Sequence, residues 1–286
     1  MKLARRSLLL GAAGSVAVGS PLAVSLGAGP GQARQDAGLE LAGRYVQGGH
    51  AIGRTWPRAL IFVDGEALTT ASSEGWFFVG FDRDAPGSVQ IEARAGERSI
   101  STTLGIAPGQ FPSSRIDGLP AATVDPADPA LQARIQREVA LKTEGFASRI
   151  DADHFRDGFA WPLDAFRVSS RWGSQRILNG TPARPHYGID MAAPQGTPIR
   201  APAAGRVTLA QPSLHFEGGL ILIDHGQGLI TAYLHQSRLE AAAGRQVLKG
   251  EILGYVGMTG RATGPHLCWR MKWRDRNVDP SLMVPN

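Results

Sequence analysis

The sequence of 286 residues predicts a mainly β chain with one helical segment. Three observations carry this prediction. Residues 39–119 contain short apolar runs separated by turn residues, residues 266–273 alternate between polar and apolar side chains, and residues 129–145 have an amphipathic helical pattern. The length allows two domains of ordinary size, and a hydrophobic content of 43% is enough for buried cores. We therefore expect two β domains with a helical connection.

The first β domain is predicted over residues 34–119. Its strands are expected at residues 59–63, 76–81, 89–93 and 99–106. The pair Asp64-Gly65 follows the first of these strands and is a strong hairpin signal. Strands at this spacing are typical of a small β-sandwich. We interpret His50 as a loop residue, and the domain as a scaffold, with partner binding or partial cover of a site in the second domain as alternatives.

The connection between the domains is predicted at residues 120–160. Asp128-Pro129 has the residue types of a helix N-cap and first turn. A helix is expected from there to about Gly145, with an apolar stripe that packs between the two domains. His154 follows in a polar stretch and is interpreted as solvent-exposed.

The second β domain is predicted over residues 161–286. Strands are expected at residues 206–210, 219–224, 229–235 and within 247–257. Residues 225–228 read as a hairpin loop, so His225 is interpreted as a structural residue that hydrogen-bonds locally. His215 is likewise interpreted as a loop residue. Two prolines and a glycine within residues 185–194 exclude a regular helix there, so an extended segment is expected.

Residues 1–33 have the pattern of an export signal. Three basic residues precede an uncharged, mostly apolar run, and the segment contains no acidic residue. The sequence RRSLL at residues 5–9 resembles a twin-arginine signal. A membrane anchor is the alternative, because roughly 20 apolar residues can span a bilayer, but a proline and several glycines weaken it. We expect cleavage between Ser25 and Ala37, and a protein exported to the periplasm or cell envelope without stable membrane insertion.

Most of the excess of basic over acidic residues in the chain lies in this segment. Removal of residues 1–33 lowers the formal net charge from +5 to +2. Nucleic-acid binding requires a clustered basic face, so the charge argues against a nucleic-acid partner. A weakly cationic mature chain is compatible with an anionic polymer.

Five residues of metal-hydrolase type occur in three short clusters. They are His186, Asp190, His235, His266 and Cys268. Residues two or four apart on an extended chain point to the same face, so we expect His186 beside Asp190 and His266 beside Cys268. A catalytic zinc ion takes three protein ligands from His, Asp, Glu and Cys and keeps one position open, and this set can supply them. Cys268 is the only cysteine, which excludes an internal disulfide.

The motifs HYGID, YLH and TGPHLC occur in this order, separated by Gly-rich strand segments. They resemble the lysostaphin/LytM-type zinc endopeptidases, which cut the cross-link peptides of peptidoglycan. The similarity covers about residues 165–282. It implies a LytM-like antiparallel β domain of the duplicated hybrid motif type, with Zn²⁺ as cofactor and peptidoglycan stem peptides as substrate.

The resemblance also implies roles for the five residues. His186 and Asp190 take the positions of zinc ligands, and His235 and His266 those of catalytic residues that act on the substrate and the water. The third ligand in that family is a second histidine, where this sequence has Cys268. Because cysteine is a good zinc ligand, we assign Cys268 to the metal.

The sequence leaves alternatives for the bond that is cut and for the class of protein. A twin-arginine-like signal without wall-binding repeats favours a D-alanyl-diaminopimelate cross-link over a glycine bridge. A different class is a non-catalytic LytM-like module that binds the cell wall or activates other wall hydrolases. A third is a thiol hydrolase in which Cys268 acts with His266 or His235. Zinc content separates the first class from the second.

Overall fold

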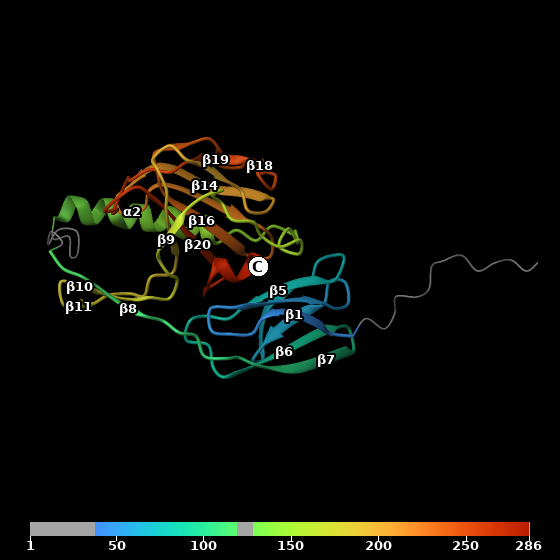
Figure 1. Cartoon of the computed structure of the whole chain (residues 1–286). Coiled ribbons are helices and arrows are strands. Elements are labelled where there is room, and N and C mark those ends of the chain that lie inside the picture. The colour runs from blue at the N-terminus through green and yellow to red at the C-terminus, as the bar shows by residue number, and fades with distance from the viewer. Residues whose placement is uncertain (1–37, 119–127, 286) are drawn as a thin grey trace, which may run out of the picture. The chain divides into compact units, whose positions relative to one another are not determined.

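The computed structural model describes residues 38–118 and 128–285 (Figure 1). The predicted export signal and its cleavage region lie outside the described residues. The described chain consists mainly of strands, with α2 (Pro129–Phe146) as its one α-helix and a short 3-10 helix, η1 (Pro280–Met283), near its end. This confirms the predicted fold class. In these two ranges, no helix has the length and apolar character that a membrane span requires.

Two antiparallel sheets form the N-terminal part. The first has the order β1 (Glu40–Arg44), β2 (His50–Arg54), β5 (Trp76–Gly80). The second has the order β4 (Glu66–Thr70), β3 (Leu60–Val63), β6 (Ser88–Ala95), β7 (Arg98–Gly105). The sheets lie in two layers in Figure 1, and apolar residues such as Phe77 and Ile91 are fully buried. The predicted β-sandwich is confirmed.

Two details of this sandwich bear on the sequence predictions. Asp64 and Gly65 both have positive φ angles, of 51° and 83°, as a two-residue hairpin between β3 and β4 requires. His50 is not a loop residue, because it begins β2 and is buried. Its ring stacks on Phe78, with 5.6 Å between ring centroids, so packing against β5 explains its place in a strand.

An antiparallel sheet of eight strands forms the centre of the C-terminal part. Its order is β18 (Gln246–Val247), β14 (Gly205–Leu214), β15 (Gly218–Asp224), β16 (Leu229–Gln236), β20 (His266–Trp273), β12 (Ile189–Ala192) and β9 (Arg167–Ser170), and β21 (Arg276–Val278) pairs with β20. A smaller sheet has the order β13 (Pro198–Arg200), β19 (Ile252–Tyr255), β17 (Arg238–Leu239). The strands predicted from the sequence are present, and the LytM-like β architecture is confirmed.

The alternation along β20 separates the two faces of the large sheet. Leu267, Trp269, Met271 and Trp273 are buried in the main core. Cys268 points to the other face and belongs to a second apolar cluster, with leucines of β14, β15 and β16. The second face of the sheet therefore has its own small core.

Helix α2 packs on this second face. The Asp128 side chain accepts a hydrogen bond from the backbone N of Ala130 at 3.1 Å, as expected of an N-cap. A Cβ on Gly145 would lie 2.9 Å from Leu222 Cδ1 and 3.2 Å from Leu209 Cβ, so glycine allows close approach to the sheet. Phe146 then joins the second apolar cluster. The predicted position between the two domains is wrong, because the helix covers the C-terminal sheet at β14.

A third small sheet connects the two parts near the edge of the large sheet. It has the order β11 (Thr181–Pro182), β10 (Gln175–Leu178), β8 (Ser113–Ile116), and the pairing of β8 with β10 is parallel. Strand β8 comes from the chain before the helix, whereas β10 and β11 precede the His186 segment. This sheet therefore brings residues of β10 close to β12.

Candidate metal centre

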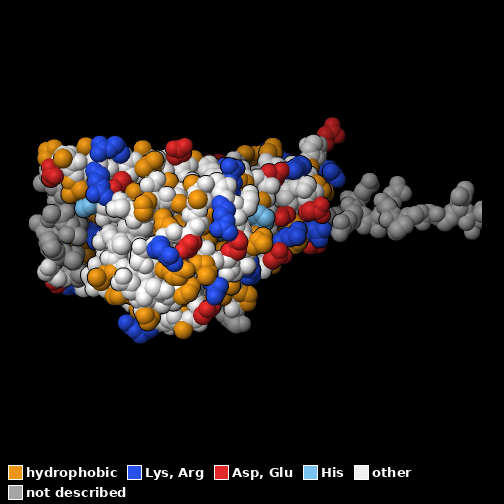
Figure 2. Space-filling view, turned by 90° about the horizontal axis from the view of Figure 1, so that it is seen from above, with side chains coloured by type: hydrophobic (Ala, Val, Ile, Leu, Met, Phe, Trp, Pro, Cys, Tyr) orange, Lys and Arg blue, Asp and Glu red, His pale blue; other side chains and the backbone are white. Residues whose placement is uncertain are grey.

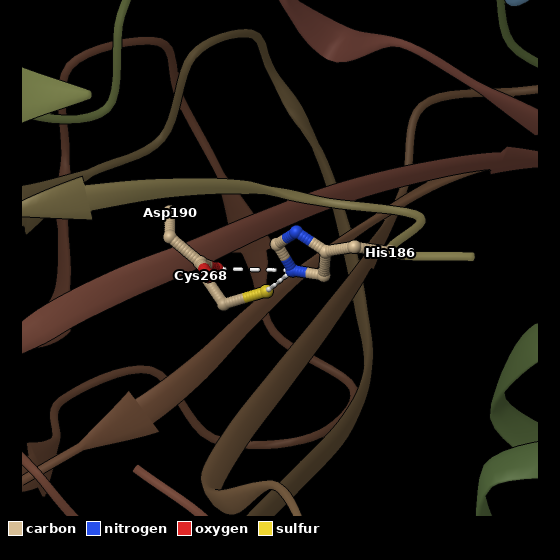
Figure 3. A group of neighbouring side chains, drawn as sticks. All are labelled: His186, Asp190 and Cys268. Carbon is tan, nitrogen blue, oxygen red and sulfur yellow. Dashed lines mark hydrogen bonds and ion pairs between the residues drawn. The ribbon is translucent and has the colours of Figure 1, made fainter. Parts of the chain in front are cut away.

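Three of the five predicted residues form a compact group (Figure 3). His186 lies in the extended segment before β12, and Asp190 in β12 pairs in register with Cys268 in β20. His186 Nε2 is 3.1 Å from Asp190 Oδ1 and 3.4 Å from Cys268 Sγ. All three donor atoms lie within 4.8 Å of one another, and all three residues are buried.

The arrangement fits a zinc ion. Nitrogen, oxygen and sulfur donors that share one tetrahedral zinc at about 2.0 to 2.3 Å are roughly 3.3 to 3.7 Å apart. Asp190 Oδ1 is buried and makes no well-aligned hydrogen bond, although His186 Nε2 lies 3.1 Å from it. His186 Nδ1 lies 3.1 Å from Ser170 Oγ, so the hydroxyl can hold the tautomer in which Nε2 is the metal-binding nitrogen.

The protonation state of the Cys268 thiol in this group depends on whether a metal cation is bound. Burial raises the pKa of the Cys268 thiol to about 12. Burial alone would also raise the pKa of Asp190, but its interaction with His186 lowers that pKa below its ordinary value. Burial lowers the pKa of His186, which favours the neutral imidazole. In the absence of a cation the thiol is therefore protonated at neutral pH, and a metal ion would displace that proton.

Each anionic donor also has an arginine partner. Arg176 Nη2 lies 3.2 Å from Asp190 Oδ2, the oxygen that does not face His186. Arg270 Nε donates to Cys268 Sγ at 3.4 Å. These guanidinium groups orient the two donors in the way that outer-shell hydrogen bonds orient metal ligands.

His235 and His266 lie next to this group. Their ring centroids are 4.7 Å apart, and His266 Nε2 is 3.9 Å from Asp190 Oδ1. His235 Nδ1 is 2.9 Å from the carbonyl O of Thr259, and His266 Nδ1 is 2.8 Å from the carbonyl O of Gly264. A carbonyl only accepts, so each Nδ1 carries its proton and each Nε2 has a lone pair in the neutral ring.

The backbone at His235 is unusual. Residues 219 and 221 of β15 pair with residues 236 and 233 of β16, so β16 contains one extra residue in a bulge. His235 lies in this bulge with a φ angle of 66°, in the left-handed region that a bulky side chain rarely adopts. The bulge thus turns the His235 side chain toward the group formed by His186, Asp190 and Cys268. Burial lowers the pKa of His235 to about 4, so this ring is neutral at pH 7.

The remaining histidines lie apart from this site. His225 is fully buried, with Nδ1 2.6 Å from the carbonyl O of Ala204 and Nε2 2.7 Å from Thr231 Oγ1, so the structural interpretation of His225 is confirmed. His215 lies in a turn, as predicted, and His154 is half-buried rather than fully exposed.

A cleft of about 1410 Å³ contains the site. All five predicted residues line it, together with Arg176 and Arg270. The alternation predicted along residues 266–273 places Arg270 on the same strand face as Cys268 but indicates no role for it. The sequence has no local signal for Arg176, because its contact with Asp190 depends on the β8–β10–β11 sheet.

A mainly β fold with a buried His/Asp/Cys group and two further histidines in one cleft defines a metallopeptidase-type protein. The profile of Peptidase family M23 matches residues 184–280. A crystal structure from Pseudomonas aeruginosa assigned to peptidase M23 is 30% identical, covers 84% of this chain and 95% of that chain, and superposes with a TM-score of 0.66. The chain belongs to peptidase family M23, which confirms the resemblance found in the three motifs.

Two curated relatives match the C-terminal part. The DD-carboxypeptidase/endopeptidase Mpg of Neisseria meningitidis is 41% identical over 125 residues, which cover 43% of this chain and 29% of that protein. The peptidoglycan DD-endopeptidase ShyA of Vibrio cholerae is 36% identical over 121 residues, which cover 42% of this chain and 28% of that protein. The chain thus spans less than a third of the length of either relative.

Proposed function

We propose that this protein is a zinc-dependent endopeptidase that hydrolyses peptide cross-links of peptidoglycan. The observation that carries the proposal is the placement of the His186, Asp190 and Cys268 donor atoms within 4.8 Å of one another, in a cleft that also holds His235 and His266. Family membership and the relatives named as peptidoglycan or DD-endopeptidases support it.

His186, Asp190 and Cys268 would hold the ion. When bound, zinc lowers the pKa of a water molecule toward neutrality and polarises the carbonyl of an amide. The chain contributes the donors, the orientation of those donors by Ser170, Arg176 and Arg270, and a cleft in which a peptide can lie next to them.

The two histidines handle protons. With Nδ1–H fixed on a backbone carbonyl, Nε2 of each ring is the atom that exchanges a proton with water or substrate. His235 is neutral at pH 7 because burial lowers its pKa to about 4, so its Nε2 is a proton or hydrogen-bond acceptor. His266, nearer to Asp190, orients the water or stabilises the oxyanion after protonation. Either division of roles between the two rings satisfies the proposal.

The location and substrate of the protein follow as further parts of the proposal. The export signal predicted at residues 1–33 would deliver the chain to the cell envelope, where peptidoglycan is the accessible polymer. A D-alanyl-diaminopimelate cross-link is the proposed bond, and the N-terminal β-sandwich is the proposed scaffold. Cleavage restricted to pentaglycine substrates would contradict this choice of bond.

The test combines metal content with activity. Zinc would be measured by elemental analysis of the purified mature protein and of Cys268→Ala, together with muropeptide release from purified sacculi. We expect about one zinc per chain, chelator-sensitive release, and loss of both in Cys268→Ala. His154→Ala, which changes a histidine outside the metal group, serves as the matched control and should keep both properties.

Two outcomes would point to the other classes. Absence of zinc and of muropeptide release, even after zinc is supplied, would identify a non-catalytic module. Release that resists chelators but is abolished by thiol alkylation would identify a thiol hydrolase.

A further inference from the structure

The turn between β9 and β10, Arg171–Ser174, holds one of the proposed metal ligands by its backbone. Gly173 N donates to the carbonyl O of His186 at 2.7 Å, and His186 N donates to the carbonyl O of Ser174 at 2.9 Å. The hydroxyl oxygen of Ser170, the last residue of β9, lies 3.1 Å from His186 Nδ1. The backbone and the ring of His186 therefore both take their positions from this one segment.

A tryptophan in this turn reaches the N-terminal part of the chain. Trp172 is 4% exposed, and its ring centroid lies 5.7 Å from that of Phe111, which precedes β8. A Cβ added to Gly48, in the turn between β1 and β2, would lie 2.4 Å from Cζ3 of Trp172. The Trp172 ring also lies 5.9 Å, centroid to centroid, from the ring of Tyr187, the neighbour of His186. The indole thus contacts both a glycine of the sandwich and the neighbour of a proposed ligand.

An arginine of the sandwich holds the same turn. Arg83 follows β5, and its Nε donates to the carbonyl O of Gly173 at 2.9 Å. Its guanidinium carbon lies 4.5 Å from the centroid of the Phe111 ring, and its side chain is 17% exposed. Gly173 therefore accepts a hydrogen bond from the sandwich and donates one to His186. This residue is a direct backbone connection between the N-terminal part and a proposed ligand.

These contacts are largely buried, unlike the charged groups on the outer surface. On the face of the molecule drawn in Figure 2, basic and acidic side chains are interspersed. Ion pairs between exposed side chains fix a neighbouring group only weakly. A packed interior has few voids and transmits the displacement of one group to the groups around it. A shift of the sandwich relative to the turn would therefore move His186.

We propose that the N-terminal β-sandwich positions the metal centre, through the packing of Trp172 and the hydrogen bond from Arg83 to Gly173. Trp172 and Arg83 are then positioning residues, because they act through His186. This inference rests on the role of His186 as a zinc ligand in the proposed function. The groups of such a site must be held within about 0.5 Å of their productive positions. The sandwich would thus contribute to the geometry of the site as well as serving as a scaffold.

The first test compares two glycines of the sandwich that have the same backbone angle. Gly48 and Gly65 both have a φ angle of 83°, so alanine strains the backbone by a similar amount at both. At Gly48 the added Cβ meets the side chain of Trp172, whereas nothing lies within 4 Å of it at Gly65. Competition with a chromogenic chelator would measure the zinc affinity of each folded full-length variant. We expect Gly48→Ala to bind zinc about 10-fold to 100-fold more weakly than the wild type, and Gly65→Ala to bind it like the wild type.

The second test compares two arginines of the sandwich. Arg83 and Arg94 each lie over a phenylalanine ring and form an ion pair with a nearby carboxylate. Arg83 also donates to the backbone of Gly173, whereas Arg94 lies on β6 and pairs with Glu92 of the same strand. Methionine keeps an apolar side chain and removes the donors. We expect Arg83→Met to weaken zinc binding by about 10-fold, and Arg94→Met to leave it unchanged.

Cobalt(II) provides a readout that a purely structural role would not change. Bound in place of zinc, it has visible absorption bands that depend on the geometry of its ligands. These bands should differ from those of the wild type in Gly48→Ala and Arg83→Met, and should coincide with them in Gly65→Ala and Arg94→Met. Tm measured with chelator present would record any loss of stability separately.

Digestion of sacculi by the wild type separates this proposal from the proposed function. Wild-type zinc affinity and cobalt bands in a folded Gly48→Ala variant would overturn the positioning role, and if that variant does not fold, the same result in Arg83→Met would overturn it. Digestion together with that result would leave the endopeptidase and remove the positioning role. Weakened zinc binding in the variants, without digestion by the wild type, would leave the positioning role and remove the endopeptidase. A wild-type chain that binds no zinc would overturn both.

Discussion

Arg270 Nε donates a hydrogen bond to Cys268 Sγ across 3.4 Å, from the same face of β20 and two residues further along the strand. A charged donor stabilises a thiolate relative to a thiol, and it fixes the direction of the sulfur lone pairs. The contact thus counteracts the effect of burial on Cys268, which favours the neutral thiol. Arg270 therefore orients Cys268, a proposed metal ligand, as outer-shell residues orient the ligands of zinc sites.

Arg270→Met should weaken zinc binding. Loss of an outer-shell partner lowers metal affinity by about 10-fold to 100-fold, and we expect a decrease in this range, with partial recovery in Arg270→Lys. Competition with a chromogenic chelator measures the affinity, and circular dichroism checks the fold. Unchanged affinity in a folded Arg270→Met protein would show that the sulfur does not depend on this donor.

Cys268→His should shift the pH dependence of hydrolysis toward acid. Zinc with a carboxylate, a thiolate and a neutral imidazole has no net charge, whereas two imidazoles and one carboxylate leave +1. The less positive ion acidifies water less, so the wild type should need a higher pH for full activity. The measurement is the acidic limb of kcat/KM against pH on a soluble cross-linked peptide. Coincident limbs, with equal zinc content, would contradict the charge argument.

Acid should destabilise the fold through buried histidines outside the metal site. Burial lowers the pKa of His50 and of His225 from 6.5 to about 4. Between these values the unfolded chain binds more protons than the folded chain, so stability is fully present above pH 6.5 and is lost as pH falls toward 4. The loss is at most about 3 kcal/mol for each residue.

His50→Phe tests this linkage. Phenylalanine preserves stacking on Phe78 and cannot titrate, so the fall in Tm between pH 6.5 and 4 should be smaller than in the wild type. Both proteins would be measured with chelator present, to remove any metal contribution. Parallel curves of Tm against pH would exclude His50 as a source of acid sensitivity.

The site was predictable wherever local spacing determines it. His186 and Asp190 are four residues apart on an extended segment, and His266 and Cys268 are two apart on a strand. The two-residue alternation of side chains along an extended chain therefore places each pair on one face. Their convergence depends on the register Asp190↔Cys268. Only the resemblance between ordered motifs could indicate that pairing from the sequence.

The features that were missed depend on longer-range geometry. Arg176 reaches Asp190 through a small sheet in which β10 pairs in parallel with β8, from a distant part of the chain. The position of α2 follows from the close approach of Gly145 to Leu209 of β14 and Leu222 of β15, which an amphipathic pattern does not reveal. His50 enters a strand because it stacks on Phe78. None of these partners is near in sequence.

His235→Asn should separate stability from activity. His235 has a φ angle of 66°, which costs an ordinary side chain about 1 to 2 kcal/mol, whereas asparagine tolerates this region better than most residues. The variant should therefore keep a Tm close to that of the wild type despite the smaller buried side chain. An amide cannot exchange a proton as imidazole does, so muropeptide release should fall by about 100-fold to 10,000-fold. Zinc content should be unchanged, because His235 is not among the three proposed ligands.

The bulge in β16 then has a functional explanation: the backbone strain is retained because it turns a neutral imidazole toward the cleft. A large loss of Tm together with an equal loss of zinc would instead make His235 a structural residue of the sheet.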